Sequence, residues 1–341
     1  MTEKERLFGA LDRTSVDRVP CASPLQTGTV ELMEKAQAWW PEAHIEPRAM
    51  ARLAKASHTF AGIESVRVPF DVTVDASAFG ARTGMERIDR QPAVIAPVFP
   101  SDARLDIDVP DPLRDGRSPM LLAAIRELKE DPDLRGTPVI CGVTGPFMLS
   151  CQLRGIDRAM IDVVVEPELI VRMLESATEW CVSFIDEAIR AGADVIALTD
   201  ATSSGDILSP EQYRSFALPY QRAIAERIAF DGSRSVLHIC GDTSRDLDMM
   251  ADCGFGGVSV DQCMDMRYVS MLLKGRAACI GNVSPTTTLL SKRTSDVEYE
   301  TMDAMRKGTD VVAPGCGFAP RTPLANMRAM ANTVKMSAKR P

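Results

Sequence analysis

The sequence predicts an α/β fold, a TIM-type (β/α)8 barrel with an N-terminal helical extension and a β-hairpin excursion. From residue 138 onward, short apolar segments alternate with amphipathic stretches, a pattern typical of a parallel sheet covered by helices. With two earlier segments they give eight strand candidates, and eight βα units close into a barrel more readily than they form an open sheet. No G-x-G-x-x-G follows these strands and no G-x-x-x-x-G-K-[ST] occurs, so neither dinucleotide-binding nor P-loop folds are indicated.

Each strand is expected where a short run is almost continuously apolar, and each helix where apolar residues recur every three or four positions. The expected strands are residues 18–21, 65–68, 138–143, 194–198, 235–239, 257–260, 277–281 and 310–313. The expected helices are residues 2–11, 29–38, 46–60, 117–130, 146–154, 156–163, 167–191, 210–230, 243–252, 267–274, 286–290, 295–308 and 323–338. Thr2 followed by Glu5 gives the first helix a capping-box pattern at its start.

We expect residues 1–341 to form a single (β/α)8-barrel domain. At about 150 residues per domain the length suggests two, but α/β barrels exceed 200 residues as one unit, and no linker or internal repeat interrupts the chain. Residues 1–64 are expected to form an N-terminal helical segment. Residues 72–112, rich in Pro, Gly, Asp and Val, contain short β-like runs such as Ala93-Val94-Ile95 and are expected to form a hairpin insertion.

Composition excludes several classes of protein. The chain is 45% hydrophobic and 25% charged, which is ordinary for a globular protein. Its net charge of −8 comes without a basic run, so nucleic acid and anionic membranes are not expected partners. No run of 18 apolar residues occurs, so no membrane insertion is expected. Residues 1–20 lack the apolar core of a signal peptide, so a cytoplasmic location is expected.

The nine cysteines do not resemble a disulfide framework, because their number is odd and they are spread thinly along the chain. In a reducing compartment such thiols are core residues, metal ligands or nucleophiles. His238 and Cys240 lie two apart on an expected strand, so both side chains point to the same face, toward the barrel mouth. Cys316 follows the last expected strand, at the same end of the barrel. An imidazole, two thiolates and an open fourth position are typical of a catalytic zinc site.

A plainer interpretation competes with this one. A His-x-Cys pair is common by chance, and cysteine is often a small buried hydrophobe. Four other cysteines, Cys141, Cys151, Cys181 and Cys279, lie within apolar segments and are expected in the core. The metal hypothesis therefore depends on Cys316 meeting His238 and Cys240 in space.

Several motifs resemble the uroporphyrinogen decarboxylase superfamily over nearly the whole chain, and within it the zinc-dependent methylcobamide:thiol (coenzyme M) methyltransferases. The superfamily motifs are Asp17-Arg18-Val19-Pro20, Thr144-Gly145-Pro146-Phe147, Gly192-Ala193-Asp194, Leu208-Ser209-Pro210-Glu211, Phe216-Ala217-Leu218-Pro219 and Gly281-Asn282-Val283. The methyltransferase branch is indicated by His238-Ile239-Cys240-Gly241 and Pro314-Gly315-Cys316. The decarboxylases have no metal and carry an N-terminal Arg-Gln-x-Gly-Arg-Tyr stretch, whereas residues 21–28 here contain no arginine.

The resemblance implies Zn²⁺ held by His238, Cys240 and Cys316, and a thiol that accepts a methyl group from a methylcobamide. A thiol coordinated to zinc is deprotonated and becomes a strong nucleophile. The methylcobamide corrinoid is expected on a separate corrinoid protein, because no Asp-x-His-x-x-Gly type loop follows His238. The acceptor is expected to be a small thiol substrate such as coenzyme M.

Four more residues are candidates for the site. Asp200 and Asn282 follow expected strands and could orient substrate or ligands as catalytic groups, although such residues often only cap the next helix. Arg321 could pair with an anionic group on the thiol, against the default of a solvated surface arginine. Asp261 could face the site and bind substrate or complete the zinc shell, with Cys263 or water as the other candidates for the fourth ligand.

Three alternatives stay open at this point. The first is a metal-free decarboxylase on the same fold. The second is a barrel that has lost turnover and serves as a corrinoid or methyl-carrier partner. The third keeps the corrinoid and the zinc but changes the acceptor to tetrahydrofolate, homocysteine or another thiol.

Overall fold

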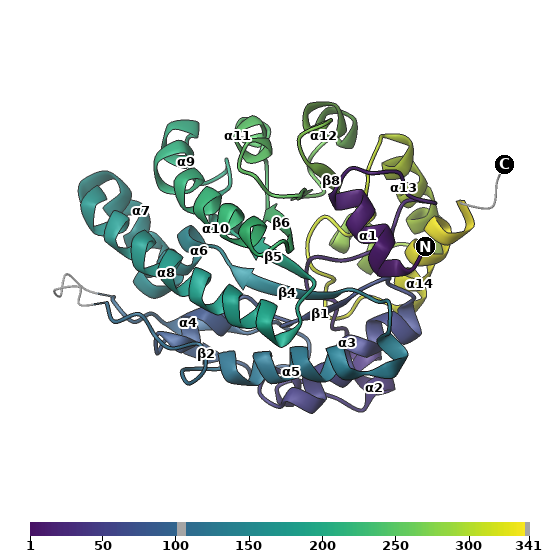
Figure 1. The fold of residues 1–341 in the computed structure, drawn as a ribbon, viewed down its shortest axis with the longest axis horizontal. Coiled ribbons are helices and arrows are strands. Elements are labelled where there is room, and N and C mark those ends of the chain that lie inside the picture. Colours follow the sequence, from purple (N-terminus) through teal and green to yellow (C-terminus); the bar gives the residue numbers. More distant parts are fainter. Residues whose placement is uncertain (101–106, 338–341) are drawn as a thin grey trace.

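The computed structural model describes residues 1–100 and 107–337 (Figure 1). Six parallel strands are hydrogen-bonded in the order β1-β4-β5-β6-β7-β8. They are β1 Val66–Val68, β4 Val139–Thr144, β5 Val195–Thr199, β6 Arg234–Ile239, β7 Gly257–Val260 and β8 Ala278–Ile280. All six lie where the sequence predicts them, because strands buried on both faces are marked by continuous apolar runs.

Two further segments close this sheet into a barrel. They form isolated parallel bridges, which pair Cys21 with Val312, Ile280 with Val311 and Val283 with Pro314. On the other side, the Glu64 N–H donates to the Cys21 carbonyl oxygen (2.7 Å), just before β1. The strands predicted at residues 18–21 and 310–313 thus fill the remaining two positions of the (β/α)8 barrel. Pro20 and Pro314 lack an N–H group, which limits both segments to short bridges.

Helices surround the barrel and connect successive strands (Figure 1). The α-helices are α1 Glu3–Leu11, α2 Val30–Ala36, α3 Pro47–Ala61, α4 Val74–Ala78, α5 Ser118–Glu130, α6 Pro146–Arg154, α7 Ile156–Val165, α8 Pro167–Ala191, α9 Pro210–Phe216, α10 Leu218–Phe230, α11 Leu247–Ala251, α12 Met266–Leu273, α13 Thr294–Arg306 and α14 Leu324–Ser337. Within residues 1–100 and 107–337, three short 3₁₀ helices and one π-helix complete them: η1 Glu42–His44, η2 Pro132–Leu134, η3 Ala201–Ser203 and η4 Pro285–Leu290. The predicted capping box at Thr2 and Glu5 is present.

The helix predicted over residues 210–230 is two helices. It breaks at Ala217, whose backbone (φ −118°, ψ −57°) lies outside regular helical geometry. Pro219, in the first turn of α10, explains the break, because proline suits the start of a helix and cannot supply an interior N–H.

The predicted hairpin lies within residues 72–112. It consists of antiparallel β2 (Arg82–Gly84) and β3 (Ala93–Ala96), with an irregular register between Arg82 and Thr83. Short α4 precedes it and was not predicted. Residues 101–106 of this segment, and residue 338 of the predicted closing helix, lie outside the described residues. The division into one barrel domain, a helical segment over residues 1–64 and this insertion stays a prediction.

Helix α1 closes the end of the barrel where the strands begin. Its Leu7, Ala10 and Leu11 are buried in one cluster with strand residues that point inward, such as Ile140 and Val236. The opposite end, where the strands finish, is left for polar side chains. Across the described residues, no helix combines the length and apolar character needed to cross a membrane.

Candidate metal centre

The three predicted metal ligands meet at the carboxyl end of the barrel. His238 is the fifth residue of β6, Cys240 follows that strand directly, and Cys316 follows the bridge formed by Pro314. His238 Nε2 lies 3.1 Å from Cys240 Sγ, which lies 3.6 Å from Cys316 Sγ. All three ligand atoms lie within 4.8 Å of one another. The parallel order of the strands therefore joins residues that are 76 positions apart.

Two glycines allow the chain to present the two sulfur atoms. Gly241 has φ +76°, and a Cβ there would lie 2.2 Å from the Asp206 carboxylate. A Cβ on Gly315 would lie 2.4 Å from the Gln262 backbone nitrogen. Both contacts are far closer than atoms tolerate, so any larger residue would displace the loops that carry Cys240 and Cys316.

His238 is held in a fixed orientation. Its side chain is fully buried, and Nδ1 lies 3.0 Å from Ser259 Oγ on β7. Because Nδ1 is engaged by Ser259, the other ring nitrogen, Nε2, points toward the sulfur of Cys240. A metal-binding histidine commonly has its second ring nitrogen engaged in this way, which fixes the ring and its tautomer.

The electrostatics of the two thiols favour a bound cation. The hydrogen bond from Cys240, with a further contribution from His238, lowers the pKa of Cys316. The same hydrogen bond to Cys316, together with burial, raises the pKa of Cys240. The pair therefore loses one proton readily and holds the second, because two neighbouring thiolates would repel each other. A divalent cation removes that repulsion, and borderline-soft zinc prefers this N and S donor set. The donor set thus fits zinc.

A cavity of about 140 Å³ opens beside the three ligands. Its wall comes from five parts of the chain: the loop after Cys21, strand β1 with its following loop, the ends of β4 to β6 with the residues that follow them, the predicted hairpin, and the segment that contains Cys316 and Gly317. The lining residues include Gln26, Arg67, Asp71, Met148, Thr199 and Gln91. Gln91 lies between β2 and β3, so the hairpin contributes to the wall of the metal site.

Asp200 lies behind this wall rather than in it. Its side chain is fully buried; Oδ1 accepts from the Met148 N–H (2.7 Å) and Oδ2 from Gln221 Nε2 (2.8 Å). Its own N–H donates to the His238 carbonyl oxygen at 3.0 Å. Burial raises the pKa of Asp200 to about 6. These contacts connect the start of α6 to the strand that carries His238.

Asn282 and Asp261 belong to one neighbouring network. Asn282 Nδ2 donates to the backbone oxygens of Asp261 and Met264, both at 2.9 Å. Asp261 is buried, and Oδ1 accepts from the Cys263 N–H. Its charge contributes to the raised pKa of Cys240. Among the described residues, the group with metal-binding spacing contains neither Asp261 nor Cys263.

Arg321 lies at the surface. Its side chain is 73% exposed, and Nη2 lies 2.7 Å from Asp89 Oδ2 in the loop between β2 and β3. Arg321 is not among the described residues that line the 140 Å³ cavity. Its position links the hairpin to the segment that follows Cys316.

Sequence reasoning missed Arg67. It is the central residue of β1, it is 2% exposed, and it lines the same cavity as the metal ligands. The available signal was a charged residue inside the apolar run Val66-Arg67-Val68, where an outward-facing side chain is the usual interpretation.

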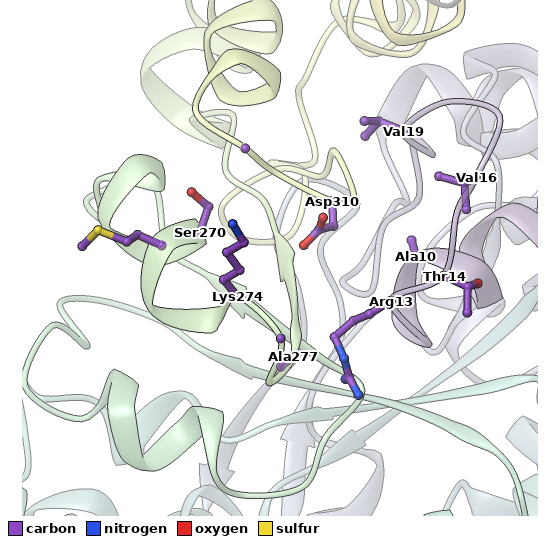
Figure 2. A pocket seen from close by; sticks show the side chains of 12 residues that line it. Ala10, Arg13, Thr14, Val16, Val19, Ser270, Lys274, Ala277 and Asp310 are labelled. Carbon is purple, nitrogen blue, oxygen red and sulfur yellow. The ribbon is translucent and has the colours of Figure 1, made fainter.

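A second, larger cavity of about 740 Å³ lies at the other end of the barrel, beside α1 (Figure 2). Figure 2 shows Arg13, Lys274 and Asp310 around it, close to where the strands begin. Active sites of TIM barrels form at the end where the strands finish, so this cavity is separate from the candidate chemistry.

Comparison with known proteins gives one consistent family. The family model described as uroporphyrinogen decarboxylase (URO-D) matches residues 2–337. The chain is 38% identical over 332 residues to the methylcobamide:CoM methyltransferase MtaA of Methanosarcina barkeri, covering 96% of each chain. It is 35% identical over 334 residues to methylcobamide:CoM methyltransferase MtbA of Methanosarcina acetivorans, covering 98% of each. A solved methyltransferase structure from Methanosarcina mazei superposes with a TM-score of 0.94 at 38% identity, covering 99% of each chain.

Proposed function

Since this chain belongs to the uroporphyrinogen decarboxylase (URO-D) family, we propose that it is a zinc-dependent methyltransferase that moves a methyl group from a methylcobamide to a small thiol. The observation that carries the proposal is the meeting of His238, Cys240 and Cys316 beside a cavity. Full-length similarity to methylcobamide:CoM methyltransferases supports the same reaction. We further propose that the methylcobamide is presented by a separate corrinoid protein, at the end of the barrel where the strands finish.

His238 Nε2 and the sulfurs of Cys240 and Cys316 would hold the zinc. When bound, zinc supplies a Lewis acid that lowers the pKa of a coordinated thiol, so the thiol is ionised at neutral pH. In the overall reaction an S–CH₃ bond forms and the Co–C bond breaks. The electron pair of that bond stays on cobalt, and the thiol proton is released to solvent.

The remaining residues position this site. Ser259 orients His238, and Asp200 ties the start of α6 to the backbone of β6. Asn282 fixes the loop that carries Asp261 and Cys263, the two candidates among protein groups for a fourth metal ligand. We therefore propose Asp200 and Asn282 as positioning residues, and Asp261 as a neighbour of the metal.

The cavity favours a methyltransferase over a decarboxylase. Leu25 and Gln26 line the cavity in the segment where the decarboxylases carry their arginines. A substrate with many carboxylates would need several guanidinium groups at that place.

We also propose that the protein acts in the cytoplasm. All nine cysteines are free thiols in the structure. Two of them belong to the candidate metal centre, which oxidation to a disulfide would destroy. A reducing compartment keeps such thiols available.

The test combines zinc content with methyl transfer. Wild type, Cys316→Ala and the matched control Cys253→Ala, a buried cysteine outside the site, are purified without chelator. Zinc is measured by elemental analysis, and loss of methylcobalamin is followed by absorbance with and without 2-mercaptoethanesulfonate. We expect about one zinc per chain in wild type and in Cys253→Ala, and loss of zinc and of transfer in Cys316→Ala.

Four outcomes would overturn the proposal. Wild type without zinc would remove the metal, and methylcobalamin loss that does not depend on a thiol would remove the thiol acceptor. Transfer to tetrahydrofolate but not to any thiol would show that the acceptor is an amine. Cys240→Ala with unchanged transfer would indicate that the ligand set has no role in turnover.

A further inference from the structure

We propose that the loop after β6 holds a hard cation on the buried carboxylate of Asp246, with calcium as the expected ion. This second metal site is separate from the candidate zinc centre, because Asp246 follows Cys240 by six positions and the donors are oxygens instead of nitrogen and sulfur. The inference does not depend on the proposed methyl transfer. It concerns an ion that stabilises the loop, and its test needs no assay of activity.

Asp246 is a buried carboxylate without a partner. Its side chain is fully buried, and neither Oδ1 nor Oδ2 accepts a hydrogen bond from any residue that the structure describes. Other buried carboxylates are engaged: Asp71 accepts from Arg117. Asp200 accepts from Gln221. A buried charge that lacks both hydrogen bonds and a counter-charge is costly, and a bound cation would remove that cost at Asp246.

The charges around Asp246 favour a cation. Burial raises the pKa of Asp246 to about 6, so the carboxylate is ionised at neutral pH. Arg245 opposes this rise, whereas the negative charges of Asp242 and Glu211 add to it. In the described part of the chain, Arg245 donates no hydrogen bond to either oxygen of Asp246. Three carboxylates and one guanidinium leave this region negative, which attracts cations.

Gly205, in the loop between η3 and α9, leaves room for the ion. A Cβ on Gly205 would lie 2.5 Å from the Asp242 carbonyl oxygen and 3.1 Å from Asp246 Oδ2. These two oxygens therefore border one small space that any side chain at position 205 would fill. Thr243 supplies a third oxygen in the same turn: its hydroxyl is buried without a partner, and its carbonyl oxygen accepts from the Asp246 N–H (3.0 Å).

This donor set selects a hard cation. Calcium binds carboxylate and carbonyl oxygens at about 2.3–2.6 Å, tolerates irregular geometry and completes its shell with water. Among the described residues, the one cluster of three His, Cys, Asp or Glu ligands at metal-binding spacing is that of His238. The site at Asp246 thus has a single carboxylate with carbonyl and hydroxyl oxygens. We expect weak binding, with Kd about 10⁻⁴–10⁻³ M, because few ligand charges are present.

A cation at this position would stabilise the loop that begins at Cys240. The Asp242 N–H already donates to Asp206 Oδ2 (3.1 Å), which joins this loop to the one after β5. A cation bound by the Asp242 carbonyl oxygen and the Asp246 carboxylate would add a link within the loop, against Gly205. The ion therefore has a structural role and is not a second catalytic metal.

The experiment measures thermal unfolding of the purified, zinc-loaded protein. Tm is recorded in choline chloride at constant ionic strength, alone and with CaCl₂, MgCl₂ or KCl. We expect about 10 mM CaCl₂ to raise the Tm of wild type by about 2–5 °C. Asp246→Asn, which removes the charge and keeps the size, should lose this shift. Without CaCl₂ its Tm should equal or exceed that of wild type, because the unpaired buried charge is gone.

Two further variants locate the ion. Gly205→Ala leaves the carboxylate intact but fills the space beside it, so this variant should also lose the calcium shift. The matched control is Asp248→Asn on α11, whose side chain is 74% exposed, and it should keep the shift. Elemental analysis should show unchanged zinc in all three variants, which separates this ion from the candidate metal centre.

Terbium luminescence provides a measurement on wild type, so the proposal stays testable even if a variant fails to fold. Tb³⁺ takes the oxygen ligands of calcium and emits when a nearby tyrosine is excited. Burial, with the charges of Cys253, Asp200 and Asp246, raises the pKa of Tyr213, so this ring lies close enough to serve. We expect tyrosine-sensitised emission that CaCl₂ reverses and that Asp246→Asn lacks.

The outcomes decide the proposal. Absence of any rise in Tm with CaCl₂, MgCl₂ or KCl would overturn it and leave Asp246 to water or a proton. A rise that persists undiminished in both Asp246→Asn and Gly205→Ala would also overturn it, because the ion would then bind elsewhere. A rise with MgCl₂ or KCl instead, lost in both variants, would support the hard-cation site with a different ion. None of these results depends on methyl transfer, so the two proposals fail separately.

Discussion

Ser259 Oγ on β7 lies 3.0 Å from His238 Nδ1 on β6, and this contact leaves the other ring nitrogen toward Cys240. Both side chains are fully buried, so water does not compete for the hydrogen bond. A neighbouring strand therefore fixes the imidazole of the candidate metal centre. The contact lies inside the barrel, where the strand register places Ser259 directly opposite His238.

Ser259→Ala should weaken zinc binding. Removing the group that hydrogen-bonds the second ring nitrogen of a metal-binding histidine typically lowers the affinity for the metal about 10- to 100-fold. The affinity can be measured by competition with a chromophoric chelator. The control is Ser270→Ala, whose hydroxyl donates to backbone oxygens at the other end of the barrel. An unchanged zinc affinity in Ser259→Ala would show that packing alone orients His238.

Arg321→Met should loosen the hairpin over the cavity. The Arg321–Asp89 pair joins the hairpin loop to the segment after Cys316. The hydrogen bond from Arg87, followed by that from Arg321, lowers the pKa of Asp89 to about 2. Without the Arg321–Asp89 pair, trypsin should cleave faster after Arg87 and Arg90 on the exposed hairpin. The substitution does not change the sequence around these two cleavage sites, so a difference in rate reports on the mobility of the hairpin. Arg306→Met on α13 is the matched control. Equal cleavage rates in all three proteins would mean that other contacts hold the hairpin.

The sequence predicts the barrel well because its strands are buried on both faces. Runs such as residues 139–143 are continuously apolar, and the parallel sheet follows from their alternation with helices. Two of the eight strand positions shrink to bridges, which Pro20 and Pro314 explain. The break at Ala217 was missed because apolar periodicity continues through it, although Pro219 marks it.

The candidate site is predictable where strand geometry determines it. His238 and Cys240 share a face because side chains alternate along a strand, and Cys316 joins them because parallel strands end at one edge. Closeness in sequence is a weaker guide, since Arg321 follows Cys316 by five residues and still turns to Asp89. The sequence did not identify Arg67 as a site residue, because the neighbouring residues of a three-residue strand do not show whether its side chain points into the barrel or outward.

Asp200 should act as a positioning residue. Asp200→Ala leaves the Met148 N–H without its acceptor and removes one of the two acceptors of Gln221 Nε2, at a cost of about 1–3 kcal/mol for a buried group. We expect urea unfolding to show that loss, and elemental analysis to show zinc unchanged. Asp200→Asn keeps an acceptor oxygen and should recover most of the stability and methyl transfer. If Asp200→Asn is fully stable but inactive, the carboxylate takes part in the reaction.

Asp71 should make stability depend on pH. Burial alone would raise the pKa of Asp71, but the Arg117 guanidinium, with the hydrogen bond from His44, outweighs it and holds the pKa well below its usual range. A carboxylate whose pKa is lowered by folding stabilises the protein above its unfolded pKa of about 3.9. That contribution is lost as the pH falls through the folded pKa.

Asp71→Asn tests this directly. The variant leaves Arg117 buried without its counter-charge, so the free energy of unfolding in urea at pH 7 should fall by about 3–5 kcal/mol. Asp133→Asn, at a largely exposed side chain, should stay within about 0.5 kcal/mol of wild type. Below pH 4, Asp71 becomes protonated in the unfolded chain, which reduces the stability that its folded-state charge provides. The difference in the free energy of unfolding between wild type and Asp71→Asn should therefore become smaller. If the difference in the free energy of unfolding stays constant from pH 7 to pH 3, the destabilisation of Asp71→Asn comes from packing and not from charge.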